Sequence, residues 1–241
     1  MALTNKHTLE DHGSAQEIFK AAINLDPQYA ETWAWLAWSC LAEISLVGTE
    51  ERQALLEEGF QAATRAVELD DRSSFAHYVL GVAYAWNEQY ARSIGEAEKA
   101  VALNPYNARA CMGLGNRLDL VGRSVEGINK MEKGLGLSPR DPLSPTIMAY
   151  LSRARLGRGE PAIALEWIDR AVNLQPDNPD LQYRYAICLA HLDHVDEAKG
   201  VLNECERTEP GFLKKRSSWQ PYSDDERNER FFAGVRRHGL L

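Results

Sequence analysis

The chain has 241 residues, of which 44% are hydrophobic and 26% are charged, a composition typical of a folded globular protein with a sizeable core. Its formal net charge of −8 argues against general nucleic-acid binding, because phosphate contacts need a basic surface. The sequence has no run of 18 apolar residues, and residues 1–13 lack the apolar core of a signal peptide. We therefore expect a cytoplasmic protein that binds neither nucleic acid nor membrane.

The first predicted helix begins at Thr8, an N-cap residue with Asp11 three positions on, and ends at Asp26-Pro27. Its apolar residues recur at helical spacing, at Ala15, Phe19, Ala22 and Leu25. The next helix is predicted to begin near Ala30. Pro27 to Asp71 is 44 residues, and we place an insertion at residues 42–53, with Thr49 as the N-cap of a following helix that ends near Glu68.

Residues 74–139 contain two consecutive 34-residue units. The equivalent residues are Leu80-Gly81 and Leu114-Gly115, Ile94 and Ile128, Glu98-Lys99 and Glu132-Lys133, Leu103 and Leu137, and Pro105 and Pro139. This period, with a Leu-Gly pair near the start and a proline at the end, resembles the tetratricopeptide repeat (TPR), in which each unit is a pair of helices.

The repeat register extends through most of the chain. Units are expected to end near Pro27, Asp71, Pro105, Pro139, Pro176 and Pro210. The unit that ends at Pro176 is three residues longer, and we expect its first helix to have Ser144 as N-cap and Pro145 at its first position. The predicted fold is all-α: a right-handed α-α superhelix of about five and a half TPR units over residues 1–210.

Small residues recur where helices of this pattern cross. Within units these are Ala37, Gly81, Gly115, Ser152 and Ala186, and between units they are Ala15, Gly59, Ser93, Gly127, Ala164 and Ala198. Only small side chains allow helix axes to approach to about 8 Å. The series therefore supports the same register.

Residues 211–241 depart from the repeat and are predicted to form a C-terminal helical cap. A short helix is expected at residues 212–219, and a capping box at residues 223–226 should begin a last helix. Stacked repeats need an atypical end to cover the apolar core, and Trp219, Phe231 and Phe232 suit that role.

No pattern of residues indicates catalysis, a metal or a cofactor. The four cysteines are far apart and are expected to be buried thiols. His191 and His194 are close in sequence, with Asp193 between them, but they fall in a predicted helix-end turn exposed to solvent. We expect a protein that is not an enzyme, with no catalytic residues, no metal site and no cofactor.

The TPR resemblance places the first helix of each pair on a concave groove, and an apolar, aromatic groove suits an extended peptide or a helix. The groove residues that we expect to bind a partner are Trp38, Phe75, Tyr78, Val82, Arg109, Met112, Asn116, Arg153, Tyr183 and Ile187. Chaperone-binding TPRs hold a terminal carboxylate with Lys and Asn, but Ala34 and Trp38 occupy those positions here. The resemblance therefore disfavours chaperone C-termini as partners.

Three further features resemble one group of TPR proteins. They are the junction at residues 137–142, the insertion after the first Trp-rich helix, and the tail at residues 221–240. The combination resembles the C-terminal TPR region of proteobacterial class III adenylate and guanylate cyclases and of related winged-helix regulators. The resemblance implies a regulatory or partner-recruiting role, and no nucleotide or metal residue is carried over.

Two functions remain open from the sequence. The first is a protein-interaction module that binds a peptide or a partner domain in the groove. The second is a self-association module that forms a homodimer through the insertion around Ile44–Val47 or through the C-terminal cap. A measurement of molecular mass by light scattering separates them.

Overall fold

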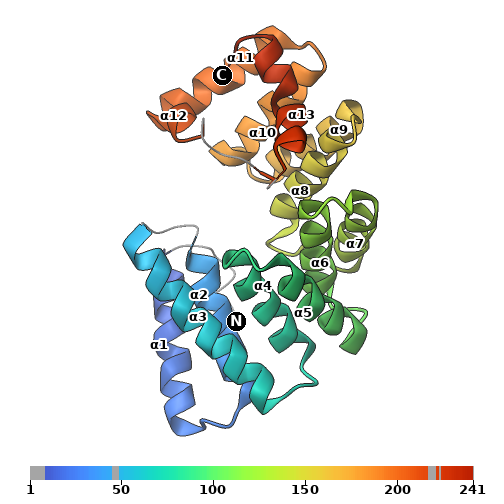
Figure 1. Cartoon of the computed structure of the whole chain (residues 1–241). Coiled ribbons are helices and arrows are strands. Elements are labelled where there is room, and N and C mark those ends of the chain that lie inside the picture. The colour runs from blue at the N-terminus through green and yellow to red at the C-terminus, as the bar shows by residue number, and fades with distance from the viewer. Residues whose placement is uncertain (1–8, 45–48, 217–220, 223, 241) are drawn as a thin grey trace. The chain divides into compact units, whose positions relative to one another are not determined.

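The computed structural model describes residues 9–44, 49–216, 221–222 and 224–240, and every regular element in these ranges is an α-helix (Figure 1). The helices are α1 (Leu9–Leu25), α2 (Ala30–Glu43), α3 (Thr49–Leu69), α4 (Ser74–Trp86), α5 (Tyr90–Leu103), α6 (Ala108–Leu120), α7 (Ser124–Leu137), α8 (Ser144–Gly157), α9 (Pro161–Leu174), α10 (Pro179–His191), α11 (Val195–Thr208), α12 (Phe212–Arg216) and α13 (Asp225–Arg237). The expected all-α fold class is confirmed. The expected N-cap Thr8 and the residue Trp219 lie outside these ranges.

The helices pack as successive pairs joined by short turns. Helix α2 packs on α3, α4 on α5, α8 on α9 and α10 on α11, and α1 packs on α2 as the second helix of an incomplete pair would (Figure 1). In these four complete pairs the first helix has a second helix packed behind it, which is the arrangement that the 34-residue period predicts.

The helices divide into two compact units. The N-terminal unit comprises residues 1–117 and 136–138, and the C-terminal unit comprises residues 118–135 and 139–241.

Small residues lie at the helix crossings, as the sequence predicts. A Cβ atom on Gly59 would lie 3.0 Å from the Leu41 side chain, and one on Gly81 would lie 3.1 Å from the Ser93 carbonyl oxygen. Ala37 and Ala186, at equivalent positions of two other units, have no exposed surface. Such separations leave no room for a larger side chain.

Two helix starts differ from the predicted ones. Helix α8 begins at Ser144, and its N-cap is Leu143, whose backbone N–H donates to the Asp141 carboxylate at 2.9 Å. This local turn displaces the expected cap by one residue. The N-cap of α13 is Asp224, which accepts a hydrogen bond from the backbone of Arg227 at 3.2 Å, whereas the expected cap Ser223 is outside the described residues.

The predicted insertion adds length to one second helix. Helix α3 begins at Thr49, which was expected to be the N-cap just before the helix, and has 21 residues, whereas α5 has 14. Ile44, at the end of the preceding helix, is buried. Residues 45–48, part of the proposed self-association loop, lie outside the described ranges.

Candidate partner-binding surfaces

A row of aromatic rings runs from α1 across the first helices α2 and α4 of the N-terminal unit. Trp35 of α2 lies between Phe19 of α1, with ring centroids 6.5 Å apart, and Phe75 of α4, at 4.4 Å. The row continues along α4, where Phe75 stacks on Tyr78 at 6.3 Å, and Tyr78 contacts Trp38 at 5.7 Å. Contacts at these distances stabilise the helix packing beyond simple area burial. We call these five rings the aromatic row.

Helix α6 adds a cation to the aromatic row. The guanidinium of Arg109 lies 5.3 Å from the ring of Trp38, within the range of a cation–π contact. Gly113, one turn later, allows α6 to approach closely, since a Cβ atom there would lie 3.0 Å from Tyr78. Four residues predicted to share a face, Trp38, Phe75, Tyr78 and Arg109, are thus brought together.

A cavity of about 470 Å³ opens at one end of the aromatic row. It lies between the start of α2 and the junction of α3 with α4, and its lining residues are Gln28, Tyr29, Ala30, Glu31, Trp35, Leu69, Asp70, Ser73 and Phe75. The two charged members of this set are both carboxylates. We call it the acidic cavity.

Glu31 is held in a defined position in the acidic cavity by two aromatic side chains. The Tyr29 hydroxyl donates to Oε2 at 2.9 Å, and the Trp35 indole N–H donates to Oε1 at 3.2 Å. The bond to Glu31 raises the pKa of Tyr29. Because a carboxylate oxygen has two lone pairs, each oxygen of Glu31 retains capacity for another donor.

Asp70 is the second carboxylate of the acidic cavity. Its Oδ1 accepts the backbone N–H of Arg72 at 3.0 Å, which closes the turn between α3 and α4. Among the residues that the structure describes, no donor reaches Oδ2. The Arg72 side chain is exposed and does not line the cavity.

In the C-terminal unit, the first helices are covered by the end of the chain. Helix α13 packs on α10 and α8, whereas α12 packs on α11 (Figure 1). Gly234 allows the closest approach, because a Cβ atom there would lie 2.6 Å from the backbone nitrogen of His191. Phe231 and Phe232 are buried. The tail therefore covers the faces of α8 and α10.

A buried ionic cluster fixes this tail. Asp119, which has no exposed surface, accepts hydrogen bonds from Arg153 of α8 at 2.8 Å and from Arg227 of α13 at 2.8 Å. Ser124 donates to the same carboxylate at 2.7 Å. Burial alone would lower the pKa of Arg153, but Asp119 raises it, so the guanidinium stays charged. Two cations and one anion thus share a largely buried site.

Tyr222 completes the cluster. The centre of its ring lies 3.7 Å from the guanidinium of Arg227 and 5.2 Å from that of Arg153, and its hydroxyl donates to the Arg153 carbonyl at 3.1 Å. The Asn228 side chain exchanges two hydrogen bonds with the Tyr222 backbone, at 3.0 and 2.7 Å. These bonds fix the path of the chain into α13.

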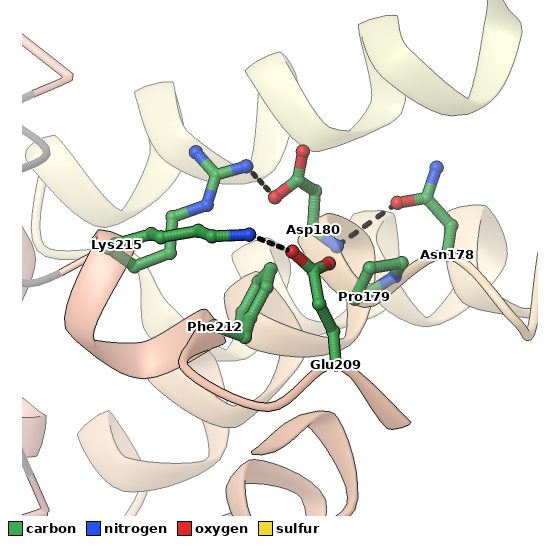
Figure 2. Close-up of a pocket in the computed structure, with 7 residues that line it drawn as sticks. Asn178, Pro179, Asp180, Glu209, Phe212 and Lys215 are labelled. Carbon is green, nitrogen blue, oxygen red and sulfur yellow. Dashed lines mark hydrogen bonds and ion pairs between the residues drawn. The ribbon is translucent and has the colours of Figure 1, made fainter. Parts of the chain in front are cut away.

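The C-terminal unit has its own cavity, of about 430 Å³, between the start of α10 and α12 (Figure 2). It is crossed by two ion pairs. Lys215 donates to Glu209 at 2.6 Å, and Arg216 pairs with Asp180. The Arg216 guanidinium also lies 5.5 Å from the centre of the Phe212 ring. We call this the paired cavity, since its acids are matched by its own cations.

The ten expected groove residues divide by exposure. Six are buried, namely Trp38, Tyr78, Met112, Arg153, Tyr183 and Ile187, and four are partly exposed, namely Phe75, Val82, Arg109 and Asn116. In the aromatic row, neighbouring rings bury one another. In the C-terminal unit, Arg153 lies under Tyr222, and Tyr183 contacts Phe212 edge-on at 5.9 Å. The role of the ten residues in partner binding stays a prediction, and the half-exposed members are the ones that a partner can reach directly.

The polar groups that remain are the buried cysteine thiols and the side chains that could bind a metal. Burial raises the pKa of the Cys40 and Cys188 thiols to about 12, so neither is ionised at neutral pH. Within the described ranges, no group of three or more His, Cys, Asp or Glu side chains is arranged to hold a metal ion. In the same ranges, every helix is too short or too polar to cross a bilayer.

Sequence reasoning did not identify several residues of these surfaces. Asp70 lies beside the predicted unit end at Asp71, and no sequence pattern marks it as a binding residue. Tyr222 and Arg227 belong to the C-terminal tail, outside the repeat pattern. One available signal was that Asp119 and Arg153 both fall on inner faces of predicted first helices and have opposite charges. The residues that complete the cluster come from 69 to 108 positions away in sequence, which periodicity does not connect.

Comparison with known proteins supports the repeat assignment. Family models of the tetratricopeptide repeat match residues 4–29 and 151–206. Anaphase-promoting complex subunit 3 of Schizosaccharomyces pombe is 24% identical over 174 residues, which is 72% of this chain. The match spans 25% of that curated relative, so this chain corresponds to about a quarter of its length.

Solved structures show the same fold. The chain matches a structure of the APC/C hetero-tetramer Cut9-Hcn1 with a TM-score of 0.73 and 15% identity, over 94% of this chain and 40% of that one. TTC0263 of Thermus thermophilus matches with a TM-score of 0.60 and 23% identity, over 75% and 92%. YrrB, described as a TPR protein with an unusual peptide-binding site, matches with a TM-score of 0.54 and 19% identity, over 82% of this chain and 95% of that one. The chain therefore contains tetratricopeptide repeats.

Proposed function

We propose that this chain is a non-catalytic protein-interaction module that binds a peptide or a partner domain at the first-helix face of its N-terminal unit. The observation that carries the proposal is the difference between the units. The aromatic row and the acidic cavity remain partly open, whereas α13 covers α8 and α10. Within the described residues of the N-terminal unit itself, these side chains are half-exposed and can contact a ligand.

The comparisons are consistent with this proposal. The Cut9-Hcn1 structure is a hetero-tetramer of APC/C proteins, and YrrB is described as having a peptide-binding site. Those statements concern the relatives. For this chain, the support is the shared fold together with half-buried aromatic and cationic side chains, which are enriched at protein interfaces.

The proposed ligand contacts are the half-exposed members of the predicted groove in the N-terminal unit. Phe75, Val82, Arg109 and Asn116 provide an aromatic ring, an aliphatic side chain, a guanidinium and an amide. The buried members, Trp38, Tyr78 and Met112, support them from below. Arg153, Tyr183 and Ile187 have structural roles in this proposal.

The self-association alternative has less support. Ile44 is buried, and Phe231 and Phe232 of the cap are packed inside their own chain, so these residues do not offer an apolar patch to a second copy. The regulatory role implied by the cyclase resemblance remains a finer proposal that rests on the quoted sequence features. Co-purification with a cyclase-type protein from the native source tests it.

A peptide display experiment tests the interaction proposal. Random 12-residue peptides are selected against the full chain, and the selected peptides are then measured with the double variant Phe75→Ala/Arg109→Ala. The matched control is Trp167→Ala/Arg170→Ala on α9, which also removes one half-buried ring and the arginine 4.4 Å from it.

We expect the first variant to lose most peptide binding, and the control to retain it. Circular dichroism should show both variants fully helical. Equal loss in the two variants, or failure to select any peptide, would count against the N-terminal face as the binding surface.

A further inference from the structure

The acidic cavity and the paired cavity occupy the same place in their repeats. With the unit ends Pro27 and Pro176 aligned, Tyr29, Ala30 and Glu31 correspond to Asn178, Pro179 and Asp180. With the next unit ends aligned, at Asp71 and Pro210, Asp70 corresponds to Glu209 and Ser73 to Phe212. Both cavities therefore place one acid in the first turn of a first helix and another just after the following second helix.

The paired cavity contains its own cations. Arg216 reaches Asp180 and lies over the Phe212 ring, while Lys215 reaches Glu209, as Figure 2 shows for the lysine. At this position of a repeat the chain therefore places one of its own cations beside each of the two acids. The central feature of the paired cavity is the Arg216 guanidinium, which contacts both a carboxylate and an aromatic ring.

The acidic cavity lacks these cations. In the same register, Lys215 and Arg216 are replaced by Ala76 and His77. Ala76 is buried, and His77 is already engaged on both ring nitrogens, with Glu96 at 2.5 Å and with the Asp71 carbonyl at 2.9 Å. The negative charges of Glu31 and Asp70 therefore have no counterpart among the lining residues.

We propose that the acidic cavity binds an arginine side chain of the partner peptide. This inference rests on the proposed function and specifies the chemistry of its ligand. The guanidinium occupies in the N-terminal unit the role that Arg216 has in the C-terminal unit. Its charge complements the two carboxylates, and its planar face lies against the rings that line the cavity.

The lining residues suit a guanidinium better than an ammonium. Glu31 presents both oxygens from a fixed position, because Tyr29 and Trp35 each hold one of them. The planar guanidinium can donate two parallel N–H hydrogen bonds to a carboxylate that is held in one position. It also stacks on aromatic rings, and it is more weakly hydrated than an ammonium. Tyr29, Trp35 and Phe75 are the aromatic residues that line the same space.

A small probe tests the proposal directly. The acetylated and amidated tripeptide Ala-Arg-Ala is titrated into the full-length chain, and the indole N–H resonances are followed by NMR, up to about 10 mM because so small a ligand binds weakly. The same peptide with citrulline replaces the guanidinium by a neutral urea of similar shape. We expect the arginine peptide to shift the Trp35 signal, which a Trp35→Phe spectrum assigns, and the citrulline peptide to bind at least about tenfold more weakly.

Variants complete the test. The double variant Glu31→Gln/Asp70→Asn should weaken binding of the arginine peptide at least about tenfold. The asparagine amide at residue 70 still provides an oxygen that can accept the hydrogen bond of the turn. Asp180→Asn removes the equivalent acid of the paired cavity and should leave peptide binding unchanged. Absence of binding by the arginine peptide, equal binding of citrulline, or equal loss in the two variants would overturn the proposal.

The outcome is separable from that of the proposed function. Selected peptides that bind through Phe75 and Arg109 but tolerate loss of arginine and of Glu31 would refute only the arginine site. Failure to select any peptide, with the tripeptide still shifting Trp35, would instead refute the interaction surface and leave the guanidinium site in place.

Discussion

Arg227 binds Asp119 through both the side chain and the backbone of that residue: Nη2 lies 2.8 Å from Oδ1, and Nη1 lies 2.6 Å from the carbonyl oxygen. The two residues are 108 positions apart in sequence. This contact joins α13 to the end of α6 and fixes the tail over the first helices of the C-terminal unit. Arg153 shares the same carboxylate.

Replacing Asp119 by Ala should be strongly destabilising. The change leaves the Arg153 and Arg227 guanidinium groups close together in a buried site without their anion, and breaking a buried pair from one side costs about 3 to 5 kcal/mol. Urea unfolding followed by circular dichroism measures the loss. Glu126→Ala, which removes the exposed partner of Arg123, is the control and should change little. Equal stability of the two variants would show that the cluster does not fix the tail.

Gly234→Ala should loosen α13. The added Cβ would lie 2.6 Å from the backbone nitrogen of His191 and 2.8 Å from the Ala190 carbonyl carbon, and backbone atoms do not rotate away. We expect a lower melting temperature, with a loss of about 1 to 3 kcal/mol. Gly200→Ala, in α11 with nothing within 4 Å, should instead stabilise by about 0.4 to 1 kcal/mol. A stability gain in both variants would mean that α13 shifts without cost.

The helix pairs were predictable because their cause is local and periodic. Small residues such as Gly81 and Ala37 recur where helices cross, and Pro161 begins α9 as its ring geometry favours. Periodicity of this kind reports which face of each helix is apolar. It identified the repeat, the expected unit ends and several helix starts from the sequence alone.

The covering of the C-terminal unit was not predictable in the same way. Phe231 and Phe232 were expected to cover the end of the stack; in the structure both are buried, and α13 packs on α10 of the last unit and on α8 of the unit before it. The determinants are single long-range contacts, such as Arg227 with Asp119 and the His191 backbone against Gly234. Each depends on the path of a nonrepetitive segment. Helical spacing marks a face as apolar but does not specify which segment will cover it.

The docking of α13 should weaken in mild acid through His191. Its Nε2 lies 2.9 Å from the Phe231 carbonyl, and burial lowers the pKa of the imidazole below its ordinary 6.5. The unfolded chain therefore binds a proton near pH 6.5, while the folded chain binds it only at lower pH. Folding stability from this residue is complete above pH 6.5 and decreases as the pH falls through the window below it.

The contribution of His191 to folding stability can be measured by urea unfolding of the wild type and of His191→Gln. The pH is varied between 7.5 and 5, a range of about one to two units around the ordinary histidine pKa. The amide of glutamine can still donate a hydrogen bond but does not titrate. The wild type should lose more stability than the variant over this interval. Parallel pH profiles would assign the acid sensitivity to other groups.

Gly81→Leu tests the tight crossing of α4 and α5. A Cβ atom at residue 81 would lie 3.1 Å from the Ser93 carbonyl oxygen, and the Ser93 hydroxyl already donates to the Gly81 carbonyl at 2.5 Å. A leucine must therefore push the helices apart, which should cost at least about 1 to 3 kcal/mol and lower the melting temperature. Gly95→Leu, in α5 with nothing within 4 Å, introduces the same side chain without a clash and should not destabilise. Since leucine favours helix more than glycine does, only a specific steric conflict explains a loss confined to residue 81. Equal melting temperatures for the two variants would show that the crossing accommodates bulk and that small residues there are not required for packing.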